Sequence, residues 1–192
     1  MGVLEAIWLK RARGGPMDPV DEAVAVESRG LEGGAGFDGH RQVTLIEREV
    51  FDRVKAEVDD SVEPVMRRAN LLVSGIRLEG TRDRTLAVGD LRIHIHGETR
   101  PCGRMDEACE GLMNALDPHW SGGAHGSVVN DATISVGDEV RWEESRQTSS
   151  PRSHQRRFPH LSPEIRPTSL PSRSERRLRS HPPQQHSRGC LG

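Results

Sequence analysis

The sequence contains no tyrosine, few other aromatic residues and almost no lysine. Aromatic residues make up 3% of the 192 residues, and only Lys10 and Lys55 are lysines, so the remaining 25 of the 27 basic residues are arginines. We attribute this excess of arginine to a GC-rich coding sequence rather than to a binding site.

Long apolar runs are also absent. No segment is long enough to cross a bilayer, and the N-terminus lacks the apolar core of a signal peptide. The cysteines, Cys102, Cys109 and Cys190, are an odd number and form no CxxC pair, so a disulfide framework is not expected. Together these absences predict a soluble cytoplasmic protein that works in a reducing compartment and does not enter a membrane.

Charge and composition change near residue 145. Residues 146–192 contain ten arginines against only Glu164 and Glu175, so their net charge is about +8, and they hold seven of the 12 prolines. Because the whole chain carries −2, residues 1–145 must carry about −10. A segment with almost no hydrophobic pattern cannot bury enough surface to offset its ordering entropy. We therefore predict one folded domain at residues 1–145 and a disordered tail, rich in Pro, Ser and Arg, at residues 146–192.

The basic tail is not expected to bind nucleic acid. Phe158 is its only aromatic residue, whereas proteins that bind single strands combine a basic groove with stacking aromatic side chains. An out-of-frame or otherwise unselected C-terminus explains the change in composition equally well.

Hydrophobic periodicity predicts a mainly β domain (α+β) with two or three helices. Alternating or short apolar runs mark the expected strands, and every fourth residue from Ile46 to Val58 is apolar, as on one face of a helix. Thr44 and Glu47 have the spacing of a capping box at the start of this helix. Several short strands with few helices favour a barrel-like architecture. The expected strands lie at residues 3–10, 23–26, 41–45, 70–73, 91–95 and 139–142.

Glycine-rich and polar segments are expected to connect these elements. Residues 30–36 are rich in glycine but lack GxxxxGK[ST], and they lack a GxGxxG followed by a helix, so no nucleotide site is predicted there. Residues 121–126 are interpreted as a flexible joint. Residues 130–131 are interpreted as the turn of a hairpin that spans residues 128–136.

His94 and His96 alternate on one face of a predicted strand. Such a pair is a possible metal site, since imidazole is a common ligand of zinc. No third ligand is close in the sequence, and alternation on an exposed face also explains the two residues. We therefore do not predict a metal there.

The stretch around Cys102 is the strongest candidate for chemistry. It follows the strand predicted at residues 91–95 and precedes a single helix predicted from Met105 to Leu116, whose apolar residues share one face. Backbone N–H groups and the dipole at a helix N-terminus favour a thiolate over a thiol, and Arg100 and Arg104 act in the same direction. A lone cysteine is also commonly a small apolar filler. The residues alone leave both interpretations open.

Three runs follow one another around this cysteine: RANLLVSGI at residues 68–76, TLAVGD at residues 85–90 and TRPC at residues 99–102. In this order they resemble the MOSC domain family, named for the C-terminal domain of molybdenum cofactor sulfurases. The resemblance extends from about Ile7 to Trp142 and implies a MOSC-type β-barrel. It also implies that the chain binds the molybdenum cofactor, and that Cys102 carries sulfur as a persulfide or ligates molybdenum.

The resemblance further implies which residues contact the cofactor. A pterin phosphate needs positive or hydrogen-bonding partners, and arginine matches phosphate with a two-pronged fork. The candidates for cofactor binding are Arg41, Arg68, Asn70, Thr99 and Arg100. Ordinary surface arginines, strand propensity and a turn-capping asparagine explain the same residues, so both interpretations stay open.

Two kinds of function are compatible with the resemblance. The first is a sulfur carrier in which Cys102 accepts sulfur from a separate cysteine desulfurase that holds pyridoxal phosphate, and passes it to a molybdoenzyme. The second is a molybdenum-dependent reductase of N-hydroxylated compounds, with Cys102 as a metal ligand and a redox partner. Family members often have an aspartate and a histidine where this chain has Gly34, so a degenerate MOSC-like binding module is a third possibility.

Overall fold

A computed structural model of the chain describes residues 1–35 and 39–144. The tail predicted to be disordered, residues 146–192, lies outside the described residues. None of the described helices is long and apolar enough to span a membrane. The strands are β1 (Gly2–Lys10), β2 (Met17–Val20), β3 (Glu22–Val26), β4 (Gly30–Leu31), β5 (Val43–Glu47), β6 (Leu71–Ser74), β7 (Thr85–Val88), β8 (Leu91–Glu98), β9 (Ala124–Val128), β10 (Ala132–Ser135) and β11 (Glu139–Trp142). The α-helices are α1 (Arg48–Val58), α2 (Arg104–Ala108) and α3 (Leu112–Leu116), and short 3₁₀ turns lie at η1 (Pro64–Arg67) and η2 (Pro118–Trp120).

Within the described residues, seven strands close into a β-barrel, which confirms the predicted fold class. The sheet runs in the order β11-β7-β8-β9-β5-β6-β1, and the pairing of β1 with β11 closes it. Neighbouring strands are antiparallel except for β5 and β6, which are parallel. Strand β2 pairs with the outer part of β1 and extends the sheet beyond the barrel.

Inward-facing side chains of these strands fill the barrel. On β8, Leu91, Ile93 and Ile95 are fully buried, whereas the residues between them are partly exposed. This is the period of two that the sequence predicts for a strand with one buried face. Burying each such side chain stabilises the fold by roughly 1.5–3 kcal/mol, so the barrel interior is a major source of stability.

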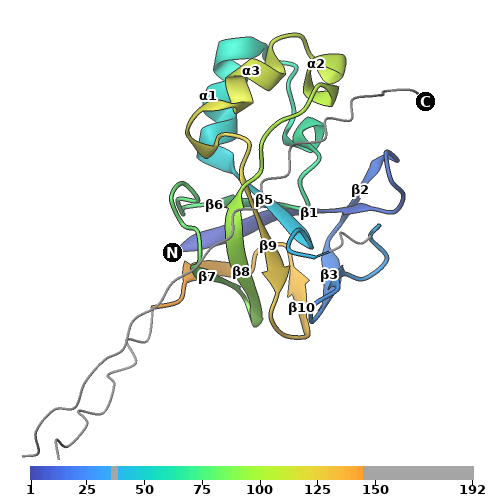
Figure 1. Ribbon diagram of the computed structural model, residues 1–192, viewed down its shortest axis with the longest axis vertical. Coiled ribbons are helices and arrows are strands. Elements are labelled where there is room, and N and C mark those ends of the chain that lie inside the picture. The colour runs from blue at the N-terminus through green and yellow to red at the C-terminus, as the bar shows by residue number, and fades with distance from the viewer. Residues whose placement is uncertain (36–38, 145–192) are drawn as a thin grey trace, which may run out of the picture. The chain divides into compact units, whose positions relative to one another are not determined.

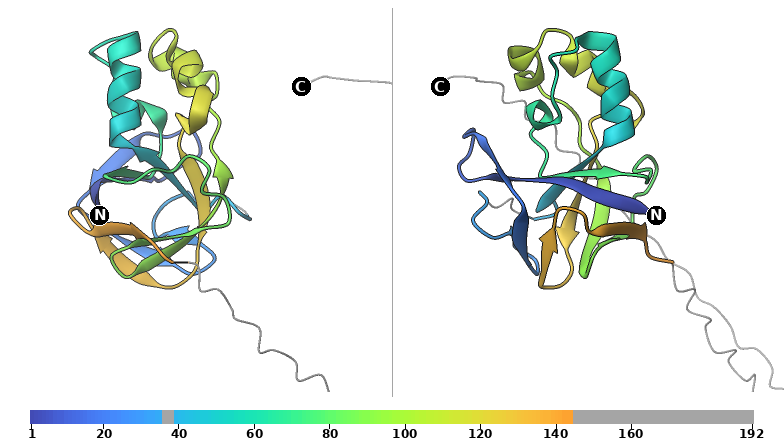
Figure 2. Two further views of the ribbon diagram at one scale, coloured as in Figure 1. Left: turned by 90° about the vertical axis from the view of Figure 1, so that its left-hand side faces the viewer. Right: turned by 180° about the vertical axis from the view of Figure 1, so that it is seen from behind.

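The α-helices gather at one end of the barrel (Figure 1, Figure 2). Helix α1 directly follows β5, while α2 and α3 lie in the connection between β8 and β9. A second buried cluster packs the helices against the barrel: Ile46 and Leu72 come from strands, and Phe51, Leu112 and Leu116 come from helices. The helical layer therefore covers the end of the barrel from which the connection containing Cys102 emerges.

The single helix predicted between residues 105 and 116 is wrong, because the structure has two helices there. Cys109 adopts an extended conformation (φ −157°, ψ 126°), and Gly111 has φ +85°, a region that glycine enters readily. The apolar spacing nevertheless corresponds to real packing, since Met105, Leu112 and Leu116 are all buried.

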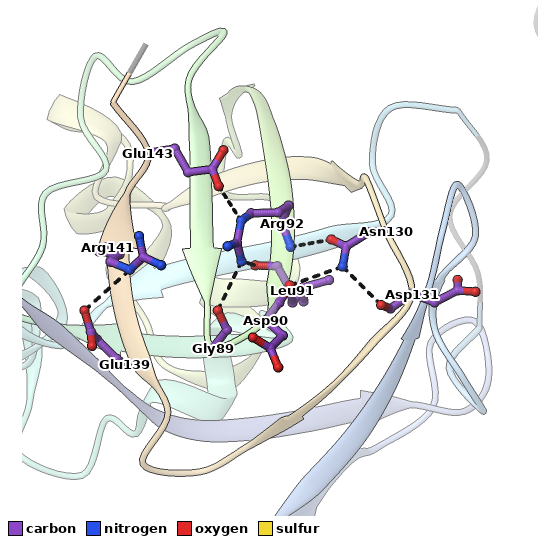
Figure 3. Close-up of polar contacts among 9 residues, drawn as sticks. All are labelled: Gly89, Asp90, Leu91, Arg92, Asn130, Asp131, Glu139, Arg141 and Glu143. Carbon is purple, nitrogen blue, oxygen red and sulfur yellow. Dashed lines mark hydrogen bonds and ion pairs between the residues drawn. The ribbon is translucent and has the colours of Figure 1, made fainter. Parts of the chain in front are cut away.

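The hairpin predicted at residues 128–136 is also wrong. Strand β10 pairs with β3, and β3 pairs with β4, in a separate three-stranded sheet. The Oδ1 atom of Asn130 accepts the backbone N–H of Arg92 at 2.8 Å, and its Nδ2 donates to the carbonyl of Asp90 at 3.1 Å. Arg92 also forms an ion pair with Glu143 (Figure 3). The predicted turn is therefore a crossover between sheets that is held to the start of β8.

The capping box predicted at Thr44 and Glu47 is not formed. Thr44 lies inside β5 and its hydroxyl donates to Asn70 Oδ1 at 2.9 Å, while Glu47 is the N-cap residue of α1 without a side-chain cap. The buried Glu47 carboxylate instead accepts the N–H of Leu78 at 2.5 Å. Burial raises the pKa of Glu47, although the Leu78 N–H opposes this effect.

We expect the variant Glu47→Gln to gain stability over the wild type as the pH rises. A carboxyl group whose folded-state pKa is raised binds its proton more tightly in the folded state, so its contribution to stability is full below the unfolded pKa and is lost as the pH rises through the folded pKa. Glutamine keeps an acceptor oxygen for Leu78 and does not ionise. Melting temperatures of both proteins at pH 4 and pH 7.5 measure the effect, and a difference that is independent of pH would contradict it.

Candidate functional site

Cys102 lies in the connection between barrel strand β8 and helix α2, and its side chain is exposed. Its carbonyl accepts the N–H of Met105 at 2.8 Å, which begins the turn of α2. Because α2 has five residues, the long helix whose dipole was expected to act on the thiol is not formed. The side chains around the thiol are therefore the feature that decides what this surface can bind.

Arg67, buried beneath this connection, is the residue that ties it to the barrel. Arg67 is 5% exposed. Its Nε donates to the carbonyl of Gly122 and its Nη2 to the carbonyl of Thr99, each at 2.8 Å. Burial, together with the positive charge of Arg41, lowers the pKa of Arg67 to about 10, although the negative charge of a Cys102 thiolate opposes this shift. The guanidinium remains charged at neutral pH and links the two segments that flank the thiol.

Residues 121–123 pack closely against the connection that contains Cys102. Ser121, Gly122 and Gly123 are buried, and Gly123 accepts the N–H of Thr99 through its carbonyl at 2.8 Å. A Cβ atom on Gly122 would lie 2.3 Å from the carbonyl oxygen of Thr99. The flexible joint predicted at residues 121–126 is therefore wrong, because this segment approaches the backbone before Cys102 too closely for a side chain.

Basic side chains gather beside helix α2, whose first residue is Arg104. Burial lowers the pKa of Lys10, and the neighbouring positive charges of Arg68, Arg41, Arg104 and Arg13 lower it further. Arg68 and Arg104 line one pocket, together with Gly14 and the acidic Glu107. We call Lys10, Arg13, Arg41, Arg68 and Arg104 the basic cluster. The domain as a whole is acidic, so this local excess of positive charge provides a place for an anion.

Thr99 and Arg100 occupy different environments although they are adjacent. Thr99 is 2% exposed, and its hydroxyl lies 3.4 Å from Nδ1 of His125. The Nδ1 of His125 also donates to the carbonyl of Glu98 at 3.1 Å. Arg100 is exposed, and its Nε lies 3.9 Å from the carboxylate of Glu98. Only Arg100 of the two can reach a ligand in solvent without a rearrangement.

Asn70 and Arg68 differ in the same way. Asn70 is buried, and its side chain accepts from the hydroxyl of Thr44 and donates to the carbonyl of Trp8 at 3.2 Å. Arg68 is half-buried and donates to the carbonyl of Gly15 at 2.5 Å. Among the predicted cofactor residues, Arg41 and Arg68 thus belong to the basic cluster, whereas Asn70 holds three segments of the fold together.

Arg67 and His125 are site residues that the sequence did not indicate. Arg67 and Arg68 are adjacent, yet Arg67 at the end of η1 is buried, whereas Arg68, which follows it in a left-handed conformation (φ +61°), is half-buried. Within residues 1–35 and 39–144, no three His, Cys, Asp or Glu side chains are arranged to hold a metal ion. A metal bound at Cys102 would therefore depend on ligands that a cofactor supplies.

We expect Arg67→Met to destabilise the protein by about 2–3 kcal/mol, because the buried carbonyls of Thr99 and Gly122 lose a charged donor. Arg68→Met is the matched control, since the half-buried Arg68 has one hydrogen bond to a backbone carbonyl and its loss leaves that carbonyl closer to solvent. Urea denaturation of both variants measures the difference. Equal free energies of unfolding for wild type and Arg67→Met would show that the buried guanidinium does not hold the two segments together.

Most of the described domain matches the model of a known protein family. The family model described as "MOSC domain" matches residues 14–141. A comparison with curated proteins found no match.

Solved structures with the same fold are distant in sequence. The YuaD protein of Bacillus subtilis is 17% identical with a TM-score of 0.62, and the match covers 73% of this chain and 94% of that protein. YiiM of Geobacillus stearothermophilus is 12% identical with a TM-score of 0.62, and the match covers 75% and 76% of the two chains. YiiM of Escherichia coli is 16% identical with a TM-score of 0.57, and the match covers 74% and 70%. At these identities the similarity concerns the fold alone.

Proposed function

The chain belongs to the MOSC domain family, and on this premise we propose that it transfers sulfur through Cys102 and binds the molybdenum cofactor beside that residue. The observation that carries the proposal is the exposed thiol of Cys102, two residues before Arg104 of the basic cluster, in a connection that Arg67 fixes through the carbonyl of Thr99. An exposed thiol on a connection that leads into a basic surface suits a nucleophile that must meet a partner protein and an anionic ligand.

The residues present fit a phosphate-bearing pterin. Arg68 and Arg104 line one pocket and Arg41 belongs to the same basic cluster, and arginine pairs with phosphate through two parallel hydrogen bonds. Exposed Arg100 can add a further contact. When bound, the cofactor would supply a molybdenum centre that accepts sulfur or takes part in redox chemistry. The chain itself would supply the positive charge that holds the phosphate and the exposed thiol of Cys102.

Sulfur transfer to Cys102 is a displacement that needs no further oxidant. The thiolate of Cys102 attacks the terminal sulfur of a persulfide carried on a cysteine of a desulfurase. A new sulfur–sulfur bond forms at Cys102, the bond within the donor persulfide breaks, and the donor cysteine leaves as a thiolate. Arg67 fixes the backbone of Thr99 below the connection, so that Cys102 is presented to the donor in a defined direction.

The test measures two quantities on the purified full-length protein: elemental molybdenum, and intact mass after exposure to a cysteine desulfurase with cysteine. A gain of about one sulfur atom supports the carrier function, and recovery of molybdenum supports cofactor binding. Stoichiometric molybdenum without a sulfur adduct would favour the alternative, a reductase of N-hydroxylated compounds with Cys102 as a metal ligand. The absence of both signals would contradict both functions. It would leave the third possibility, a binding module without chemistry.

A further inference from the structure

Four histidines from three segments meet on the outer surface of the barrel. His94 and His96 lie on β8, His125 lies on β9, and His40 precedes β5. The ring centre of His96 is 4.5 Å from that of His40, 4.9 Å from that of His94 and 6.4 Å from that of His125. His96 is therefore the centre of a group that the sequence shows only as the pair His94 and His96.

We propose that His96, together with the neighbouring imidazole of His94 or His40, binds a divalent transition metal ion of the class that imidazole prefers, with Zn²⁺ as the probe. Imidazole nitrogens bind zinc at about 2.1 Å, and two rings that share one ion at a tetrahedral angle have centres roughly 5 Å apart. The two shorter distances at His96 match this separation. The site has two protein ligands at a time, and water completes the coordination.

Hydrogen bonds already orient two of the rings. Ser127 Oγ lies 2.9 Å from Nε2 of His96, so it can accept the proton at Nε2 and leave Nδ1 for the metal. In His125, Nδ1 donates to the carbonyl of Glu98 and leaves Nε2 for a ligand. Metal-bound histidines commonly use one nitrogen for the ion and the other for such a partner.

Some charged groups near the histidines favour a bound cation and others oppose it. Asp83 Oδ1 lies 3.9 Å from Nε2 of His94 and adds negative charge beside the rings. Arg41 and Arg82 act on His125 with positive charge and oppose a cation.

The experiment is a calorimetric Zn²⁺ titration of the full-length chain. Histidines in residues 145–192 would also bind zinc, so every protein carries glutamine in place of His154, His160, His181 and His186. We expect saturable binding of about one zinc ion, weakened at least about tenfold in His96→Ala and to a smaller degree in His94→Ala. His119→Ala is the matched control, because His119 is exposed and lies beside Glu79.

Three results would overturn the proposal: no saturable binding, equal affinity in His96→Ala, or loss of binding in Cys102→Ser. The last would place the ion at the thiol instead of at the histidines. His94→Ala guards against a folding defect in His96→Ala, since the outward-facing His94 can be shortened without opening the barrel interior. Loss of affinity in both variants at unchanged melting temperature would support the site.

Discussion

Replacing Cys102 with alanine will abolish the sulfur adduct that the wild-type protein acquires from a cysteine desulfurase supplied with cysteine. The displacement needs a thiolate that a partner protein can reach, and Cys102 is the exposed cysteine of the described residues. Bound molybdenum, if the wild type retains it, will fall in the same variant. Intact mass and elemental analysis measure both quantities on the same preparation.

Cys109→Ala is the matched control for this experiment. Cys109 is partly buried and packs against the cluster between the helices and the barrel, so it is expected to keep its thiol out of reach of a donor protein. We therefore expect Cys109→Ala to acquire sulfur as the wild type does. Because Cys190 lies outside the described residues, peptide mapping must assign each adduct to its cysteine. An adduct of full yield in Cys102→Ala would show that another thiol carries the sulfur.

Gly123→Ala is expected to cost roughly 3–5 kcal/mol of stability, because the added methyl group meets both a strained backbone conformation and a steric clash. Gly123 has φ +87°, and a Cβ atom there would lie 1.9 Å from the carbonyl oxygen of Leu45 and 2.9 Å from a side-chain atom of Ile46. Neither the backbone of β5 nor the buried Ile46 can move away cheaply. The strain would also displace the carbonyl of Gly123 from the N–H of Thr99, the hydrogen bond that holds the connection before Cys102.

Substitutions at two other glycines separate the two contributions to this effect, the strained backbone conformation and the steric clash. Gly80 has φ +72° with no atom within 4 Å of a built Cβ, so Gly80→Ala measures the cost of the backbone conformation alone, about 1–2 kcal/mol. Gly103 has φ −52° and open space, so Gly103→Ala is expected to change stability little. Thermal denaturation of the three variants gives the order, and a Gly123→Ala variant no less stable than Gly80→Ala would show that the close approach to Leu45 is not maintained.

The barrel was predictable because its strands bury one face each. Alternation at residues 91–95 and the apolar run at residues 3–10 are local signals, and β8 and β1 form where these signals lie. The partner of each strand is not a local property. Residues 128–136 have the local pattern of a hairpin, but β10 buries Ile134 by pairing with β3. Pairing with a strand that is distant in the sequence therefore prevailed over the local preference for a hairpin turn.

The position of Cys102 in the fold was predictable from the sequence, but most of the packing around it was not. The run from Thr99 to Cys102 placed the cysteine between a strand and a helix, as the structure shows. The burial of Arg67 and the close approach of Gly122 both depend on segments distant in the sequence. The predicted roles of Arg41, Arg68, Asn70, Thr99 and Arg100 in cofactor binding stay predictions.

The pairing of β1 with β11 joins the beginning and the end of the barrel, with Gly2 opposite Val140. A ribosome adds about 5–20 residues per second, so β1 leaves it on the order of ten seconds before β11 is made. During this interval the apolar side chains of Leu4, Ile7 and Leu9 have no closed barrel to enter. Strand β6 is made earlier and pairs with the same part of β1, Leu4 opposite Val73. Because β6 covers the opposite edge of β1, the edge that pairs with β11 stays open to other chains until synthesis reaches the last strand.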